Sequence, residues 1–93
     1  MKYKILIVDD EEAARYGMRK ALTSRDLLIL EAADLGSARF TIEKELPDLV
    51  LLDVNLPDGS GIDLLKELSG RSTAPLVEAL LRGGFEKDPP GPL

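Results

Sequence analysis

The chain has 93 residues, of which 44% are hydrophobic, and its formal net charge is −5. This length predicts a single small domain that buries a modest share of its surface. The acidic balance argues against non-specific nucleic-acid binding, which needs clustered Lys and Arg side chains. Because cysteine is absent, a disulfide framework is excluded.

The first apolar run of the chain, residues 5–8, is short. A signal-peptide core or a membrane span needs a longer apolar segment. We therefore expect a cytoplasmic protein without a membrane partner.

The first half of the chain alternates strand and helix patterns. Residues 4–8 predict a first strand, and Ala14, Met18, Ala21 and Leu22 recur at helical spacing within residues 12–24. Residues 27–31 predict a second strand.

Asp34 is a candidate N-cap for a second helix with Leu35, Ala38 and Ile42 on one face. Pro47 ends this helix, because the residue before a proline is disfavoured in helical conformation. Residues 49–52 predict a third strand.

A loop over residues 54–61 precedes a third helix marked by Ile62, Leu65 and Leu68. Alternating strands and helices are typical of a parallel sheet with right-handed crossovers.

The pattern changes after Leu68. Residues 69–73 predict a loop, and Pro75 is a candidate first-turn residue of a short fourth helix that ends at Gly83. The Pro- and Gly-rich residues 88–93 fit neither strand nor helix. We therefore expect one domain over residues 1–87 and a tail over residues 88–93.

Acidic residues follow two of the predicted strands. Asp9 and Asp10 come directly after the first strand, and Asp53 comes after the third. Open α/β sheets bind ligands at the carboxyl ends of their strands. If these two strands are neighbours, three carboxylates converge, and clustered carboxylates favour a divalent cation that offsets their repulsion.

Each acidic group alone has a simpler interpretation. Acids after the first strand also suit a helix N-terminus, and Asp53 could initiate a turn. The two groups together, with residues 5–11 and 48–61 around them, resemble the receiver domain of bacterial two-component response regulators. The resemblance runs from residue 1 to about residue 69.

The resemblance implies a flavodoxin-like (CheY-like) α/β fold with helices on both faces of a parallel sheet. Because the chain is short, we expect it to be truncated at its C-terminal end to about three strands and three or four helices. The resemblance implies a Mg²⁺ site formed by Asp10 and Asp53 directly, by Asp9 through water, and by the backbone carbonyl of Asn55. Asp53 would accept a phosphoryl group from a sensor histidine kinase or a small phosphodonor. The chain has no histidine, so the donor must be another molecule.

The chain departs from the family pattern at two phosphate-binding positions. Receiver domains use a Thr or Ser at the end of the fourth strand and a Lys after the fifth. Ser72 and Thr73 precede the apolar stretch, so neither matches, and Lys87 is the candidate phosphate-contacting lysine. Without these groups, the phosphoryl group on Asp53 would lack charge stabilisation. Phosphorylation would also lose the contacts that drive the conformational switch.

Three hypotheses for function remain open. The first is a phosphoacceptor receiver without an output domain, which is not an enzyme beyond its own phosphorylation. The second is a degenerate, receiver-derived interaction module without phosphoryl switching. The third is a phosphatase with Asp53 as nucleophile, similar to the haloacid-dehalogenase family, although that family has an aspartate where this chain has Asn55.

The predicted truncation bears on assembly. If the fourth and fifth strands are missing, the third strand becomes an edge with unpaired backbone groups, which proteins rarely leave bare. We therefore expect a homodimer that covers this edge or the surface around the third helix.

Overall fold

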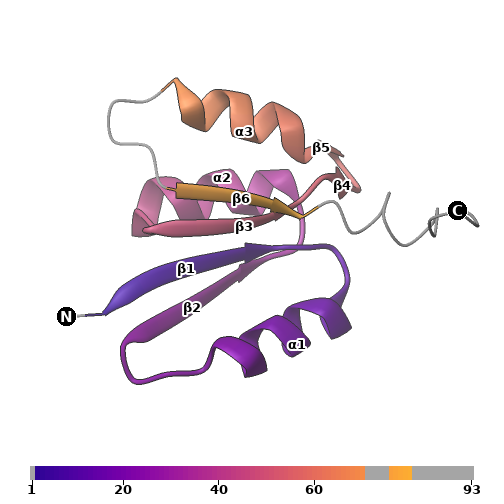
Figure 1. Cartoon of the computed structure of the whole chain (residues 1–93). Coiled ribbons are helices and arrows are strands. Elements are labelled where there is room, and N and C mark those ends of the chain that lie inside the picture. Colours follow the sequence, from indigo (N-terminus) through magenta and orange to yellow (C-terminus); the bar gives the residue numbers. More distant parts are fainter. Residues whose placement is uncertain (1, 71–75, 81–93) are drawn as a thin grey trace, which may run out of the picture.

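The structure is a computed structural model that describes residues 2–70 and 76–80. Its main sheet has four parallel strands, which are β1 (Tyr3–Val8), β2 (Leu27–Ala32), β3 (Leu49–Asp53) and β6 (Leu76–Leu80). The strand order is β2-β1-β3-β6, so β1 and β3 lie side by side at the centre (Figure 1). This order confirms the predicted flavodoxin-like arrangement.

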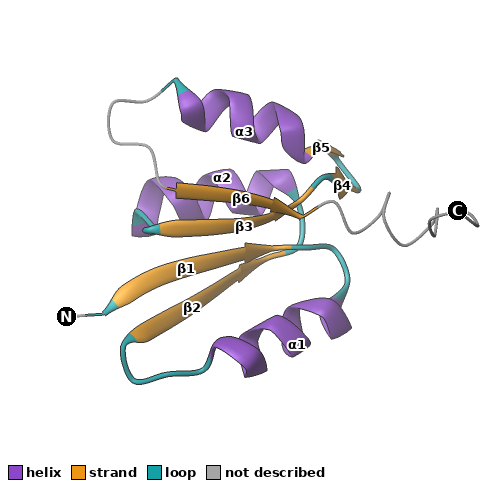
Figure 2. Ribbon diagram, viewed as in Figure 1, coloured by secondary structure: helices purple, strands orange, loops and turns teal. Residues whose placement is uncertain are grey.

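Three helices connect the strands, namely α1 (Glu12–Leu22), α2 (Leu35–Glu45) and α3 (Gly61–Ser69) (Figure 2). α2 and α3 contact one another, and the guanidinium of Arg39 donates two hydrogen bonds of 3.0 and 2.8 Å to Glu67. α1 packs against β1 and β2. None of the helices in the described ranges is long and apolar enough to cross a membrane.

The main core lies between the sheet and the helices α2 and α3. It contains alternate residues of β1 and β3, the predicted apolar face of α2, and two residues of α3. These are Leu6, Val8, Val50, Leu52, Leu35, Ala38, Ile42, Leu64 and Leu68. Ile5 and Ile7 are also buried but lie outside this cluster. α1 forms where the helical spacing predicted it, but none of its residues is fully buried.

The two ends of α2 follow the sequence signals. Asp34 accepts a hydrogen bond of 2.7 Å from the backbone N–H of Ser37, which is the expected N-cap. At the other end Leu46 adopts a left-handed conformation (φ 51°), and Pro47 follows. The N-cap side chain and the proline therefore set the length of this helix.

The segment after Pro75 differs from the prediction. Instead of a fourth helix, Leu76–Leu80 forms strand β6, which pairs in parallel with the whole of β3. β6 therefore adds one strand to the three that were expected, and β3 is not the bare edge that motivated the homodimer. The backbone groups along β3 explain the difference, because a strand satisfies them and a helix does not.

The predicted loop over residues 54–61 contains a short antiparallel hairpin. β4 (Asn55–Leu56) pairs with β5 (Gly59–Ser60) directly after β3. Several sequence predictions lie outside the described residues: the positions of Ser72, Thr73 and Lys87, the helix end at Gly83, and the tail over residues 88–93.

Candidate metal centre

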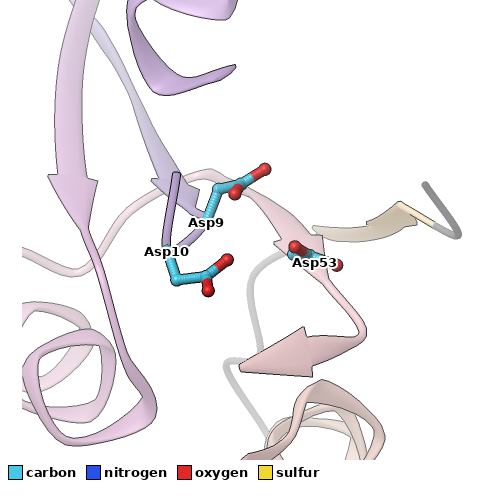
Figure 3. Close-up of side chains that lie close together, drawn as sticks. All are labelled: Asp9, Asp10 and Asp53. Carbon is cyan, nitrogen blue, oxygen red and sulfur yellow. The ribbon is translucent and has the colours of Figure 1, made fainter. Parts of the chain in front are cut away.

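Three carboxylates meet at the carboxyl ends of the two central strands. Asp9 and Asp10 follow β1, and Asp53 is the last residue of β3. One carboxylate oxygen from each residue lies within 4.8 Å of the other two, and Figure 3 shows the three side chains gathered around one space. Asp9 is 0% exposed and Asp53 is 3% exposed, whereas Asp10 is open to solvent. The predicted convergence of the three acids is confirmed.

The register of the sheet explains this convergence. Val8 of β1 pairs with Leu52 of β3, so the next residues along the chain, Asp9 after β1 and Asp53 at the end of β3, lie at the same level. Since parallel strands run in the same direction, the acids that follow them reach the same edge of the sheet.

Asp9 is held through its backbone as well as its side chain. Its N–H donates a hydrogen bond of 3.0 Å to the carbonyl of Ala32 in β2. Its carbonyl accepts a hydrogen bond of 2.7 Å from Nη1 of Arg15, and its Oδ1 accepts one of 3.0 Å from the N–H of Glu11. The turn between β1 and α1 is thereby fixed next to the cluster.

Asp53 is held by the hairpin that follows it. Its Oδ1 accepts a hydrogen bond of 3.2 Å from the backbone N–H of Asn55. Gly61 donates a hydrogen bond of 2.7 Å to the carbonyl of Val54, which brings the start of α3 back against the end of β3. The chain from Asp53 to Gly61 therefore forms a tight loop beside the cluster, where a loop was predicted over residues 54–61.

The donor set matches a hard divalent cation. All three groups offer carboxylate oxygens, which Mg²⁺ and Ca²⁺ prefer, and among residues 2–70 and 76–80 no nitrogen or sulfur ligand belongs to the cluster. Two of the carboxylates are buried, where unneutralised negative charge is costly. The cluster therefore fits a cation better than three independent surface acids would.

Two residues near the cluster carry roles that the sequence did not reveal. Arg15 donates a hydrogen bond to the Asp9 carbonyl. Asp58 accepts hydrogen bonds from the backbone N–H groups of Leu35 (2.8 Å) and Gly36 (3.0 Å). Asp58 therefore binds the N-terminus of α2 from the loop that follows Asp53. No sequence signal links residues 35 and 58, because they are 23 positions apart.

The chain is similar to known proteins over most of its length. It is 37% identical over 73 residues to the KDP operon transcriptional regulatory protein KdpE of Escherichia coli K12, covering 78% of this chain and 32% of that protein. It is also 37% identical over 89 residues to the phosphate regulon transcriptional regulatory protein PhoB of the same organism, covering 92% of this chain and 39% of that protein. The chain thus spans about a third of the length of these relatives.

The fold is likewise similar to solved structures. The signal receiver domain of a putative LuxO repressor protein from Vibrio parahaemolyticus superposes with a TM-score of 0.79 at 24% identity, covering 85% of this chain and 61% of that one. The family model of the response regulator receiver domain matches residues 5–81. The chain therefore belongs to the response regulator receiver domain family.

Proposed function

We propose that this chain is a phosphoacceptor receiver domain in which Asp53 accepts a phosphoryl group with the help of Mg²⁺. The observation that carries the proposal is the meeting of Asp9, Asp10 and Asp53 within 4.8 Å at the ends of neighbouring strands. Asp10 and Asp53 would bind the ion directly, Asp9 through water, and the carbonyl of Asn55 would complete the protein ligands. Bound Mg²⁺ would supply charge neutralisation for the transferring phosphoryl group.

In the phosphoryl transfer to Asp53, the main contribution of the protein is to position the reacting groups. With acetyl phosphate as donor, a carboxylate oxygen of Asp53 attacks phosphorus, and the bond between phosphorus and the acetyl oxygen breaks. Acetate leaves with the electron pair, and an acyl phosphate forms on Asp53. The N–H of Asn55, which donates to Asp53 Oδ1, orients the attacking carboxylate.

The physiological donor in this proposal is a sensor histidine kinase, with small phosphodonors as substitutes. Receiver domains are regulatory phosphoacceptors rather than classical enzymes, and the chain itself contains no histidine. A cytoplasmic location and the absence of membrane and nucleic-acid partners belong to the same proposal. The acidic net charge supports the absence of a nucleic-acid partner.

The test is intact-mass spectrometry after incubation with acetyl phosphate and Mg²⁺. We expect wild type to gain the mass of one phosphoryl group, and we expect no gain for Asp53→Asn or for wild type in the presence of a chelator. Equal labelling of wild type and Asp53→Asn would refute the proposal.

A second candidate is a receiver-derived interaction module that lacks phosphoryl switching. One observation favours it: β6 ends at Leu80, which pairs with Asp53. At the end of its fourth strand the family uses a hydroxyl side chain, and Leu80 is aliphatic. Lys87 remains the candidate phosphate contact. In this form the chain would bind partners through its surface irrespective of phosphorylation.

We also propose a homodimer, although the edge at β3 no longer motivates it. Among the described residues no strand pairs with the outer edge of β6, so this edge is a candidate for pairing across a two-fold axis. Sedimentation velocity at micromolar concentration tests this proposal, and a monomer would refute it.

A further inference from the structure

Arg15 connects three parts of the molecule that meet beside the acidic cluster. It lies in the first half of α1, and its side chain is only 16% exposed. Its Nη1 donates to the carbonyl of Asp9 at 2.7 Å, and its Nε lies 3.2 Å from Oε1 of Glu31 in β2. The guanidinium therefore bridges α1, β2 and the end of β1.

The bond to the Asp9 carbonyl bears directly on the geometry of the acids. The peptide group is planar, so the carbonyl of Asp9 and the N–H of Asp10 belong to one rigid unit. A donor that fixes the Asp9 carbonyl therefore fixes the direction in which the chain leaves Asp9. That direction sets how the side chains of Asp9 and Asp10 lie relative to each other and to Asp53.

Glu31 holds the guanidinium in the orientation that this bond requires. Arginine offers several N–H donors in a rigid planar fork, so binding Glu31 through Nε leaves Nη1 aimed at the Asp9 carbonyl. Lysine has a single ammonium group on a flexible stem and cannot reproduce this fork. Arg19 also pairs with Glu31, but it has no hydrogen bond to Asp9 among those described.

We infer that Arg15 is a positioning residue for the cation site, acting through the Asp9 carbonyl rather than by touching the ion or the phosphoryl group. The inference rests on the proposed function, because it assumes that Asp9, Asp10 and Asp53 bind Mg²⁺. Partners that orient metal ligands affect affinity without being ligands themselves, and their loss typically weakens metal binding about 10–100-fold.

The experiment is a Mg²⁺ titration of the whole chain, followed by amide NMR shifts, for wild type, Arg15→Ala, Arg15→Lys and Arg19→Ala. Arg19→Ala is the matched control, because Arg19 lies on the same helix as Arg15 and also pairs with Glu31. Urea unfolding without Mg²⁺ is measured for every variant, so that loss of stability and loss of affinity are separated.

We expect Arg15→Ala to weaken Mg²⁺ binding about tenfold, Arg15→Lys to restore part of the affinity, and Arg19→Ala to stay within about twofold of wild type. A purely structural role would lower the free energy of unfolding of Arg15→Ala but leave the Mg²⁺ affinity of its folded form unchanged, and that result would overturn the inference. If Arg15→Ala does not fold, the test rests on Arg15→Lys. A Mg²⁺ affinity of Arg15→Lys equal to that of wild type would then refute the positioning role.

The titration also separates this inference from the proposed function. If wild type binds no Mg²⁺, or binds it as well after Asp53→Ala, then the cation site and the positioning role both fail. If wild type binds Mg²⁺ through Asp53 and Arg15→Ala matches Arg19→Ala, only the positioning role fails.

Discussion

Gly61 packs directly against the backbone of Asp53. A Cβ atom added at Gly61 would overlap the carbonyl oxygen of Asp53 and would lie 3.1 Å from Cγ of Leu52. The first residue of α3 is therefore a glycine because the end of β3 occupies the space that any side chain would need.

Gly61→Ala is accordingly expected to destabilise the protein by about 1–3 kcal/mol, the usual range for overpacking. Because the displaced group is the backbone of Asp53, the substitution should also weaken Mg²⁺ binding. Urea unfolding and a Mg²⁺ titration measure the two effects. An unchanged free energy of unfolding would show that the end of β3 can move away without cost.

For Gly17→Ala we expect the opposite effect on stability. Gly17 lies within α1, and nothing stands within 4 Å of a Cβ atom added there. Alanine has the higher helix propensity, so this substitution should stabilise the chain by up to about 1 kcal/mol. A loss of stability in the same urea experiment would contradict the exposed position of this face of α1.

Asp58→Ala should destabilise the protein by about 1 kcal/mol, because it removes the acceptor for two backbone N–H groups at the start of α2. Asp63→Ala is a suitable control, since Asp63 is an exposed acid in the first turn of the neighbouring helix α3. Equal effects of the two substitutions would mean that Asp58 acts through its charge alone.

Asp34 should make the stability of α2 depend on pH. Its hydrogen bonds with the side chain and backbone of Ser37 lower the pKa of Asp34 below its ordinary value of 3.8. A carboxyl with a lowered folded-state pKa stabilises the fold above its unfolded pKa, and this contribution is lost as the pH falls through the folded pKa.

Asparagine caps helices about as well as aspartate but does not titrate. The advantage of wild type over Asp34→Asn in the free energy of unfolding should therefore shrink as the pH is lowered from about 5 to about 3. Urea unfolding across that range measures it. A difference between the two proteins that is independent of pH would contradict the lowered pKa.

Phosphorylation of Asp53 is expected to change the conformation little. The residue that pairs with Asp53 at the end of β6 is Leu80, which has no hydroxyl group to bind a phosphoryl oxygen. Beryllofluoride, which mimics an acyl phosphate, should therefore shift the amide signals of residues around Asp53 but few others. Large shifts across α3 and the tail would contradict this expectation.

The sequence was sufficient to predict the acidic cluster because local and regular features determine it. Apolar runs mark β1 and β3, and parallel pairing brings the ends of these strands level. Asp9 directly follows the end of β1, and Asp53 is the last residue of β3. The cap at Asp34 was equally predictable, since a cap acts within one turn of its helix.

The remaining features depend on contacts that are distant in sequence. Residues 76–80 fit both a short helix and a buried strand, and pairing with the edge of β3 favours the strand. Asp58 and Arg15 have roles only because folding brings them to Leu35 and to Asp9. Spacing along the chain does not predict such long-range hydrogen bonds.

The most direct test of the phosphoacceptor role is to locate the phosphoryl group after reaction with acetyl phosphate and Mg²⁺. Borohydride reduces an acyl phosphate to an alcohol, so a phosphorylated aspartate becomes homoserine, which peptide mass spectrometry can place in the sequence. We predict homoserine at position 53 and at no other aspartate, with its formation dependent on Mg²⁺. Homoserine at Asp9 or Asp10, or none at position 53 under conditions that keep the chain folded, would contradict the proposed function.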